Sequence, residues 1–312
     1  AMKLIRRPER KDPLFKDGSV ITIGIFDGIH LGHQALINQL MKKSEAMNLP
    51  SVFFTFEPTP NEYFSKKKHK QRLTSLRDKF NLVGHYELDY FYAPPFDQTM
   101  ENLSPEDFIN KHLIDLFNIK YLIIGDDFKF AKNRSGSSID LIKSGKCNDF
   151  EVKQLNSIVN DSSRVSSSLV REHLMKNNLP QVCEILGRNY AITGRVIYGK
   201  SLGKTIGFPT ANINLAHLDS ALRGVFYVKV KIDGMEKKYP GIANIGFKPT
   251  VGGEELCLEI HLLDFNQDIY LKYINVEFLD YLRSEQKFNG LEELTNQLKI
   301  DTEKAIAYFS NI

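Results

Sequence analysis

The sequence predicts two domains of different class: an N-terminal α/β domain with a parallel sheet over residues 1–186, and a small antiparallel β-barrel with a terminal helix over residues 187–312. The chain of 312 residues is too long for one ordinary hydrophobic core. Its first part alternates apolar β-rich runs with helical periodicity, whereas the part after Leu186 alternates apolar and polar residues between frequent glycines.

The composition excludes several classes of protein. Hydrophobic residues make up 42% and charged residues 25%, which is typical of a folded soluble chain. The net charge of +3 is too small for a DNA-wrapping protein and suits a small polyanionic substrate such as ATP. No apolar run approaches the roughly 18 residues that span a bilayer. Cys147, Cys183 and Cys257 show no disulfide or metal-ligand spacing. We therefore expect a cytoplasmic protein that binds neither nucleic acid nor membranes.

The N-terminal elements alternate between strands and helices. The runs 20–25, 51–56 and 121–124 have the composition of buried strands. Between them, Leu36, Ile37 and Leu40 repeat with helical periodicity, and the segment Ser104–Asp107 has the N-cap serine, first-turn proline and early acid of a helix start. Strands separated by helices predict right-handed βαβ units and a parallel, Rossmann-like sheet.

The C-terminal elements are mainly strands. Residues 226–232 and 256–262 alternate apolar and polar side chains, and glycines punctuate the segments around them. Helical periodicity returns only at Leu291, Leu294 and Leu298. These features predict a small antiparallel barrel followed by one helix.

The segment Gly24–His33 is the clearest chemical motif of the first half. It leaves a strand, turns on glycines and enters a helix, whose N-terminus offers free N–H groups to a phosphate. His30 and His33 flank Gly32, which lets a phosphate approach the backbone. The alternative is an ordinary strand–turn–helix with incidental histidines. The position after the first strand favours a ligand site, because open α/β sheets bind ligands at the carboxyl ends of their strands.

A second phosphate-binding candidate is the segment Val165–Arg171. Three serines that open a helix, followed by an arginine one turn later, offer hydroxyls, N–H groups and a guanidinium together. Taken alone, the same residues are more typical of a serine N-cap beside a surface arginine.

The segment Gly199–Asn212 is the clearest motif of the second half. Its glycines and lysines fit a loop that covers phosphates, although they do not form a Walker A sequence. Thr210 and Asn212 are two residues apart, so on a strand they face the same way and offer oxygen ligands to Mg²⁺. The alternative is a glycine-rich hairpin with no ligand.

A carboxylate follows in the strand 256–262. Leu256, Leu258 and Ile260 face one side of this strand, and Glu259 faces the other. Beside a MgATP site, such a carboxylate can act as a general base. A glutamate on the solvent face of an amphipathic strand is the alternative.

Together these motifs resemble, in order, the bacterial bifunctional riboflavin kinase/FMN adenylyltransferase (FAD synthetase) family. Gly24–His33 resembles the G-x-F-D-G-x-H-x-G-H string of the adenylyltransferase domain, and Gly125–Gly136 resembles its flavin- and ATP-binding loop. Ser166–Arg171 resembles S-S-T-x-x-R, with Ser168 in place of Thr. The string from Gly207 to Asn212 and the segment Gly241–Thr250 resemble the two motifs of riboflavin kinases.

The resemblance implies that the first domain adenylylates FMN with ATP to form FAD. It places catalytic roles on His30, His33 and Arg171. It places nucleotide and flavin binding on Gly24, Phe26, Asp27, Gly32, Asp127, Phe128, Arg134, Ser166, Ser167 and Ser168. The chain departs from the family at Thr59, where a histidine is usual, and at Ala131, where a glycine is usual.

The resemblance also implies that the second domain phosphorylates riboflavin to FMN with ATP. Glu259 is then the base for the ribityl 5′-hydroxyl, and Thr210 and Asn212 are the Mg²⁺ ligands. The binding residues would be Gly199, Gly203, Lys204, Gly207, Pro209, Asn244 and Arg283. The expected partners are small molecules only, and we expect a monomer or a weak homo-oligomer.

Two other functions are compatible with parts of the sequence. One is an adenylyltransferase that acts on a different phosphate acceptor, against which the riboflavin kinase motifs of the barrel argue. The other is a flavin-binding regulatory protein with an RNA-binding barrel. The barrel lacks an interleaved aromatic and basic pattern for stacking bases and carries Glu259, which argues against it.

Overall fold

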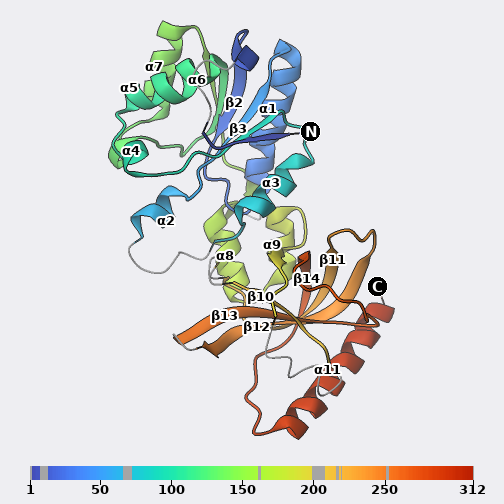
Figure 1. Ribbon diagram of the computed structural model, residues 1–312. Coiled ribbons are helices and arrows are strands. Elements are labelled where there is room, and N and C mark those ends of the chain that lie inside the picture. The colour runs from blue at the N-terminus through green and yellow to red at the C-terminus, as the bar shows by residue number, and fades with distance from the viewer. Residues whose placement is uncertain are drawn as a thin grey trace. The chain divides into compact units, whose positions relative to one another are not determined.

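The computed structural model describes residues 2–7, 13–65, 72–160, 163–198, 208–215, 218, 220–250 and 253–311 (Figure 1). The chain folds into two compact units: unit 1 comprises Ala1–Lys70 and Leu76–Ser166, and unit 2 comprises Gln71–Ser75 and Ser167–Ile312. The division falls upstream of residue 186, because helices α8 (Ser167–Met175) and α9 (Leu179–Leu186) belong to unit 2. The domain boundary at residue 186 stays a prediction.

Unit 1 is a six-stranded parallel sheet with helices, which confirms the predicted α/β class. In their order across the sheet, the strands are β1 (Lys3–Ile5), β4 (Tyr90–Tyr92), β3 (Ser51–Phe54), β2 (Ser19–Ile23), β5 (Ile119–Gly125) and β6 (Glu151–Leu155). The α-helices are α1 (Leu31–Met47), α2 (Pro60–Phe64), α3 (Leu76–Gly84), α4 (Gln98–Glu101), α5 (Pro105–Phe108), α6 (Asp115–Phe117) and α7 (Ser138–Asn148).

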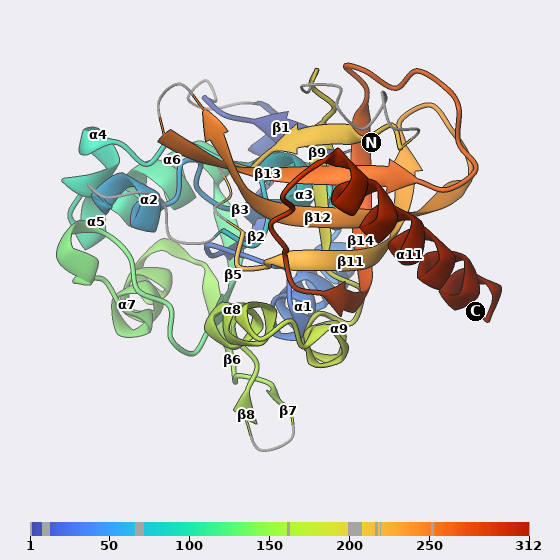
Figure 2. The same cartoon turned by 90° about the horizontal axis from the view of Figure 1, so that it is seen from below.

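Shorter elements complete unit 1. They are two 3₁₀ turns, Pro13–Phe15 and Lys132–Arg134, a π-helical turn, Ile109–Ile114, and the hairpin strands β7 (Val159–Asn160) and β8 (Ser163–Arg164). The hairpin follows β6 and extends away from the sheet (Figure 2). The predicted helix start at Ser104 is confirmed, because the Ser104 hydroxyl caps the helix by accepting the Asp107 N–H at 3.0 Å.

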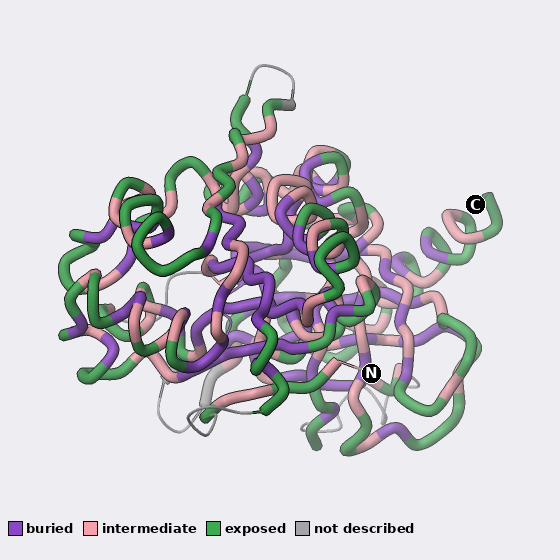
Figure 3. Tube along the Cα trace, turned by 90° about the horizontal axis from the view of Figure 1, so that it is seen from above, coloured by how far each residue is buried: buried purple, intermediate pink, exposed green. Residues whose placement is uncertain are grey.

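The central strand explains the continuous apolar runs of the sequence. All residues of β2 are buried. Val20 packs with Leu36 and Leu40 on the α1 face, whereas Ile21 and Ile23 pack with the cluster on the opposite face. Successive side chains therefore enter two different cores, as expected for a parallel sheet that is covered on both sides. Figure 3 marks the buried residues of the chain in purple.

The order of the strands places a switch point at the centre of the sheet. From β2 the chain proceeds to β3 and β4 on one side and then returns to β5 on the other side of β2. Because β2 and β5 are parallel neighbours, the segments that follow their carboxyl ends begin side by side. These segments belong to Gly24–His33 and Gly125–Gly136, two motifs selected from the sequence.

A half-buried histidine packs against the core on the opposite face of the sheet from α1. The Tyr92 hydroxyl forms a 3.1 Å hydrogen bond with Nδ1 of His112, and the imidazole packs beside the rings of Phe54 and Phe108. Burial, with a smaller contribution from the charge of Lys111, lowers the pKa of His112 from 6.5 to about 4. The folded protein therefore holds this imidazole neutral.

This burial predicts a loss of stability in acid. The unfolded chain binds a proton at His112 near pH 6.5, and the folded chain only near pH 4. Stability is thus complete above about pH 6.5 and falls as the pH decreases to about 4, by roughly 3 kcal/mol in total. In urea unfolding at several pH values, His112→Gln should flatten this dependence. The exposed His85 is the control, and equal curves for His112→Gln and His85→Gln would contradict the prediction.

Unit 2 is an antiparallel six-stranded sheet, which confirms the predicted all-β class of the second half. Across the sheet the strands are β10 (Ala211–Asn214), β13 (Gly253–Leu262), β12 (Lys238–Thr250), β11 (Gly224–Ile232), β14 (Tyr273–Arg283) and β9 (Ala191–Arg195). The helix α11 (Leu291–Ser310) packs on β12, as the helical periodicity of the C-terminal segment predicted.

The two edges of this sheet meet and nearly close a barrel. The Ile197 N–H donates to the Asn212 carbonyl at 2.8 Å, which joins the chain after β9 to β10. A side chain at Gly194 would overlap Ile213, so glycine is needed where the edges approach.

Among the described residues, no helix is long and apolar enough to cross a membrane.

Candidate functional sites

The two histidines of the first motif lie together at the start of α1. His30 is the N-cap residue, and its Nδ1 accepts the N–H of His33 at 3.4 Å. The two imidazole rings stack with centroids 3.6 Å apart. A β-carbon at Gly32 would lie 3.2 Å from the His30 ring, so any larger residue would crowd the pair. The sequence prediction that His30, Gly32 and His33 share one helix N-terminus is thus met in this geometry.

The loop that precedes these histidines has an unusual backbone. Phe26 and Ile29 have φ angles of 53° and 43°, in the left-handed region that side chains other than glycine rarely adopt. Both side chains are buried in the core between the sheet and α1, which compensates for the strain. Asp27, between them, is also buried. Strain of this kind persists where a structure holds a loop in one conformation, as ligand-binding loops require.

A buried lysine fixes the same loop from α3. Lys79 is only 1% exposed, and its ammonium donates to the Ile25 carbonyl at 2.7 Å and to the Thr55 hydroxyl at 3.3 Å. Thr55 in turn donates to the Ile25 carbonyl at 3.1 Å. Lys79 therefore ties together the segments that follow β2 and β3. The sequence analysis did not select it, although it falls on the apolar stripe of its helix with Leu76 and Val83.

The loop after β5 is tied to the β7–β8 hairpin. Asp126 accepts hydrogen bonds from the Ser157 N–H at 2.9 Å and from its hydroxyl at 2.7 Å. Arg164 pairs with Asp126 at 3.1 Å and with Asp127 at 2.8 Å. The Ser157 hydrogen bonds are the main cause of a lowered Asp126 pKa, to which Arg164 contributes. The predicted binding residue Asp127 is therefore held by Arg164, which the sequence analysis did not select.

Ala131 stands where the family usually has glycine, and its backbone conformation is one that glycine favours. Its φ and ψ angles are 63° and −175°, a combination that is almost restricted to glycine. Phe130 and Gly136 close the loop by reciprocal backbone hydrogen bonds of 3.2 and 2.9 Å. Arg134, within the closed loop, has a left-handed backbone conformation, and it is exposed. The alanine at this position therefore strains the backbone of the loop.

This strain predicts that Ala131→Gly stabilises unit 1. Relief of an unfavourable alanine conformation should add about 1 kcal/mol to the free energy of unfolding, although the unfolded chain gains flexibility. Ala191→Gly is the matched control in unit 2, because Ala191 is in a regular strand and should lose about 0.5–1 kcal/mol. Thermal unfolding of both variants measures the difference. A destabilisation of similar size in both would show that Ala131 is unstrained.

Thr59, the other departure from the family, has a structural partner. It is buried and precedes α2, and its N–H and hydroxyl both donate to the Glu62 carboxylate, at 2.7 and 2.9 Å. This is a capping box. The hydroxyl at this position thus takes part in the start of the helix.

The serine motif straddles the division between the units. α8 begins at Ser167, which confirms that the serines open a helix. Ser166 belongs to unit 1, whereas Ser167, Ser168 and Arg171 belong to unit 2. The expected cooperation of Arg171 with His30 and His33 stays a prediction.

The second candidate site is a row of polar side chains across three neighbouring strands of the barrel. Glu259 on β13 pairs in register with Asn212 on β10 and with Asn244 on β12. Residues in register on neighbouring strands present their side chains on the same face. Leu258 and Ile260 are fully buried while Glu259 is not, so the glutamate faces away from the barrel core as predicted.

Contacts around this row hold its members in place. The ammonium of Lys248 lies 3.3 Å from the Asn212 side-chain oxygen and forms an ion pair with Glu259. The Asn212 amide nitrogen faces the Thr210 carbonyl at 3.5 Å, so its oxygen faces the lysine. Nδ1 of His261 lies 3.0 Å from the Pro209 carbonyl and fixes the chain next to Thr210. An ammonium at this point shows that the oxygens of Asn212 and Glu259 accept a cation.

The structure describes some of the other residues predicted for the second site and leaves others outside its described ranges. Gly199, Gly203, Lys204 and Gly207 lie outside the described residues. Asn244 donates to Glu285 at 3.4 Å, and within the described ranges its buried side-chain oxygen has no hydrogen-bond partner. That oxygen has the properties of an unfilled ligand contact.

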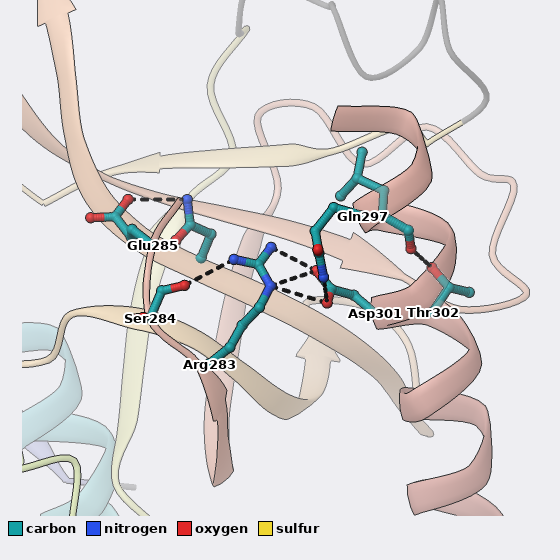
Figure 4. Close-up of polar contacts among 8 residues, drawn as sticks. Arg283, Ser284, Glu285, Gln297, Asp301 and Thr302 are labelled. Atoms are coloured by element: carbon teal, nitrogen blue, oxygen red, sulfur yellow. Dashed lines mark hydrogen bonds and ion pairs between the residues drawn. The ribbon is translucent and has the colours of Figure 1, made fainter. Parts of the chain in front are cut away.

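Arg283 joins the end of β14 to α11 (Figure 4). Its guanidinium makes three hydrogen bonds of 2.7–3.0 Å with the carboxylate of Asp301, which is 1% exposed and also accepts from Gln297 at 2.9 Å. A fourth bond reaches the Ser284 carbonyl at 2.9 Å. These bonds give Arg283 a structural role, and its assignment to ligand binding stays a prediction.

Removal of Arg283 should therefore destabilise unit 2. Arg283→Met leaves the Asp301 carboxylate buried beside Gln297 alone, at an expected cost of about 3–5 kcal/mol. The double variant Arg283→Met/Asp301→Leu removes the buried charge as well and should recover much of this loss. Denaturant unfolding of the three proteins tests the pair. Equal stability of the single and double variants would mean that the ion pair does not hold the helix.

Comparisons with known proteins identify a family for each half of the chain. The family model described as FAD synthetase matches residues 12–169, and the model described as riboflavin kinase matches residues 186–309. A bifunctional riboflavin kinase/FMN adenylyltransferase of Haemophilus influenzae is 39% identical over 310 residues, which cover 99% of this chain and 100% of the relative. One of Escherichia coli K12 is 40% identical over 308 residues, which cover 99% and 98%.

The whole chain also resembles a solved structure. A protein of Streptococcus pneumoniae described as a macrolide-efflux protein is 28% identical, with a TM-score of 0.78, over 97% of each chain. The arrangement of elements in both units therefore recurs in one solved chain of similar extent.

Proposed function

We propose a residue-level division of labour for this chain, which belongs to the family of bifunctional riboflavin kinase/FMN adenylyltransferases. Unit 2 phosphorylates riboflavin to FMN, and unit 1 adenylylates FMN to FAD, each with ATP. The observation that carries the assignment is the strand register of the barrel. It presents Asn212, Glu259 and Asn244 on one face, beside the ammonium group of Lys248.

In the kinase reaction, Glu259 accepts the proton of the riboflavin 5′-hydroxyl as the hydroxyl oxygen bonds to the γ-phosphorus of ATP and ADP leaves. The carboxylate is suited to this because it faces away from the apolar core and lies in register with Asn212. Asn244 has a buried amide oxygen free for a ligand donor among the described residues. His261 holds the Pro209 carbonyl, which fixes the position of the chain directly before Thr210.

In the adenylyltransferase reaction, an FMN phosphate oxygen bonds to the α-phosphorus of ATP and pyrophosphate leaves. His30 and His33 lie at the N-terminus of α1, where N–H groups and imidazoles together stabilise the charge on the leaving group. Lys79 and the left-handed Phe26 hold the loop before them in one conformation. Arg171 and the serines at the start of α8 supply further phosphate contacts in this proposal.

The proposal includes Mg²⁺, which would be held by Thr210, Asn212 and the ATP phosphates, and which neutralises phosphate charge when bound. The donor set fits, because the Asn212 oxygen already faces a cationic group. It also includes a cytoplasmic location, supported by three free cysteines, and a monomer or weak homo-oligomer.

The two sites should be separable by mutation. Glu259→Gln keeps the shape of the side chain but removes the base, so FMN formation from riboflavin should fall about 10²–10⁴-fold while FAD formation from supplied FMN persists. His30→Ala with His33→Ala should lower FAD formation and spare FMN formation. Chromatographic separation of FMN and FAD measures both steps in each variant.

The unaffected reaction is the control for folding in each variant. If either change impaired both reactions equally, with unfolding transitions like those of the wild type, the two sites would not be independent and the assignment would be wrong.

A further inference from the structure

We propose that Lys248 is a phosphate-positioning residue of the kinase site, an inference that rests on the function proposed for unit 2. Its ammonium group lies between Asn212 and Glu259. When ATP binds, it turns to the terminal phosphoryl group, which is the group that riboflavin receives.

The first support is the pair of groups that Lys248 contacts. Its ammonium lies 3.3 Å from the Asn212 oxygen and pairs with the Glu259 carboxylate. One of these residues is assigned to the metal and the other to the base. A single cation thus occupies the space between the two groups that must face the reacting phosphate.

The second support is how far the side chain reaches to make these contacts. In register, Lys248 lies opposite Glu255, whereas Glu259 is four residues further along β13, a distance of about 13 Å on a strand. The Glu255 carboxylate, directly opposite, accepts from Asn214 at 3.2 Å instead. Gly246 lies between them on the same strand face, and the Glu285 carboxylate occupies the space where a side chain at this position would begin.

Stability does not account for this reach. The side chains of Lys248 and Glu259 are 41% and 28% exposed, and ion pairs at such positions contribute little while immobilising a long side chain. A lysine ammonium is, however, a compact charge that binds phosphate well. A divalent cation arriving at Asn212 with the nucleotide would repel the ammonium, and the terminal phosphoryl oxygens are anionic partners that arrive with it.

Lys238 offers a matched control. It lies on the same strand, pairs with Glu277, and has a side-chain exposure of 47%. In the full-length protein, Lys248→Met should lower kcat for FMN formation about 100-fold, as expected for loss of a charged group that contacts the transferred phosphoryl. Lys238→Met should change it less than about 2-fold. An unfolding transition of unit 2 like that of the wild type shows that each variant is folded.

Nucleotide discrimination separates a phosphate contact from a structural role. Lys248→Met should raise the inhibition constant of the β,γ-imido analogue of ATP about 10-fold in the kinase assay but that of ADP less than about 3-fold, because ADP lacks the terminal phosphoryl group. A purely structural lysine would shift both constants together, and equal shifts would overturn the proposal.

Metal binding without nucleotide gives a readout that does not depend on turnover. Electron paramagnetic resonance measures the free Mn²⁺ in a titration and so gives the affinity of each protein for this ion. Lys248→Met should bind Mn²⁺ several-fold more tightly than the wild type or Lys238→Met, because the competing ammonium group is gone. Unchanged Mn²⁺ binding would also overturn the proposal. If Glu259→Gln left FMN formation intact, the kinase assignment itself would fail; if only Lys248→Met behaved like its control, the Lys248 inference alone would fail.

Discussion

The strand register of the barrel is the constraint on which the kinase site depends. Asn212, Glu259 and Asn244 are separated in the sequence, and only the pairing of β10, β13 and β12 brings them into one row. A slip of one residue in any of these strands would turn a member of the row into the core and expose a leucine or isoleucine. The apolar half of β13, with Leu256, Leu258 and Ile260 buried, therefore fixes the chemistry on the other face.

Asn212 shows how closely the closure of the barrel and the site are linked. Its carbonyl accepts the Ile197 N–H where the sheet edges meet, and its side-chain oxygen faces Lys248. Any change that opened this seam would also move the proposed metal ligand. The Arg283–Asp301 pair has a similar position at the far end of β14, where it ties α11 to the sheet next to Glu285 and Asn244.

In unit 1 the order of the strands, rather than their register, brings the candidate ligand-binding loops together. Because β2 and β5 are neighbours, their following loops begin together, and a lysine from α3 and an arginine from the β7–β8 hairpin fix them. The two left-handed, buried residues Phe26 and Ile29 indicate that this loop is held in its conformation by the core beneath it.

Local sequence patterns predicted much of this architecture. The N-cap at Ser104, the helix after Gly24 and the outward face of Glu259 each follow from a few adjacent residues. The short strands β1, β4 and β6 were missed; β1 and β4 contain three residues each, and β6 is largely exposed and polar.

Contacts between distant residues could not be read in the same way. Arg164 meets Asp126 across 38 positions, and Lys79 meets Ile25 across 54. Lys248 stood within a selected motif, but its reach past Glu255 depends on the strand register. Such contacts are consequences of the fold, so no local sequence pattern predicts them.

The central claim is that the row Asn212–Glu259–Asn244 is the face on which riboflavin is phosphorylated. A crystal structure with Mg²⁺, ADP and riboflavin tests it most directly. The account predicts the metal on the side-chain oxygens of Thr210 and Asn212, with the riboflavin 5′-hydroxyl within hydrogen-bonding distance of the Glu259 carboxylate. Nucleotide and flavin bound on another face of the barrel, with Glu259 still paired to Lys248, would contradict it.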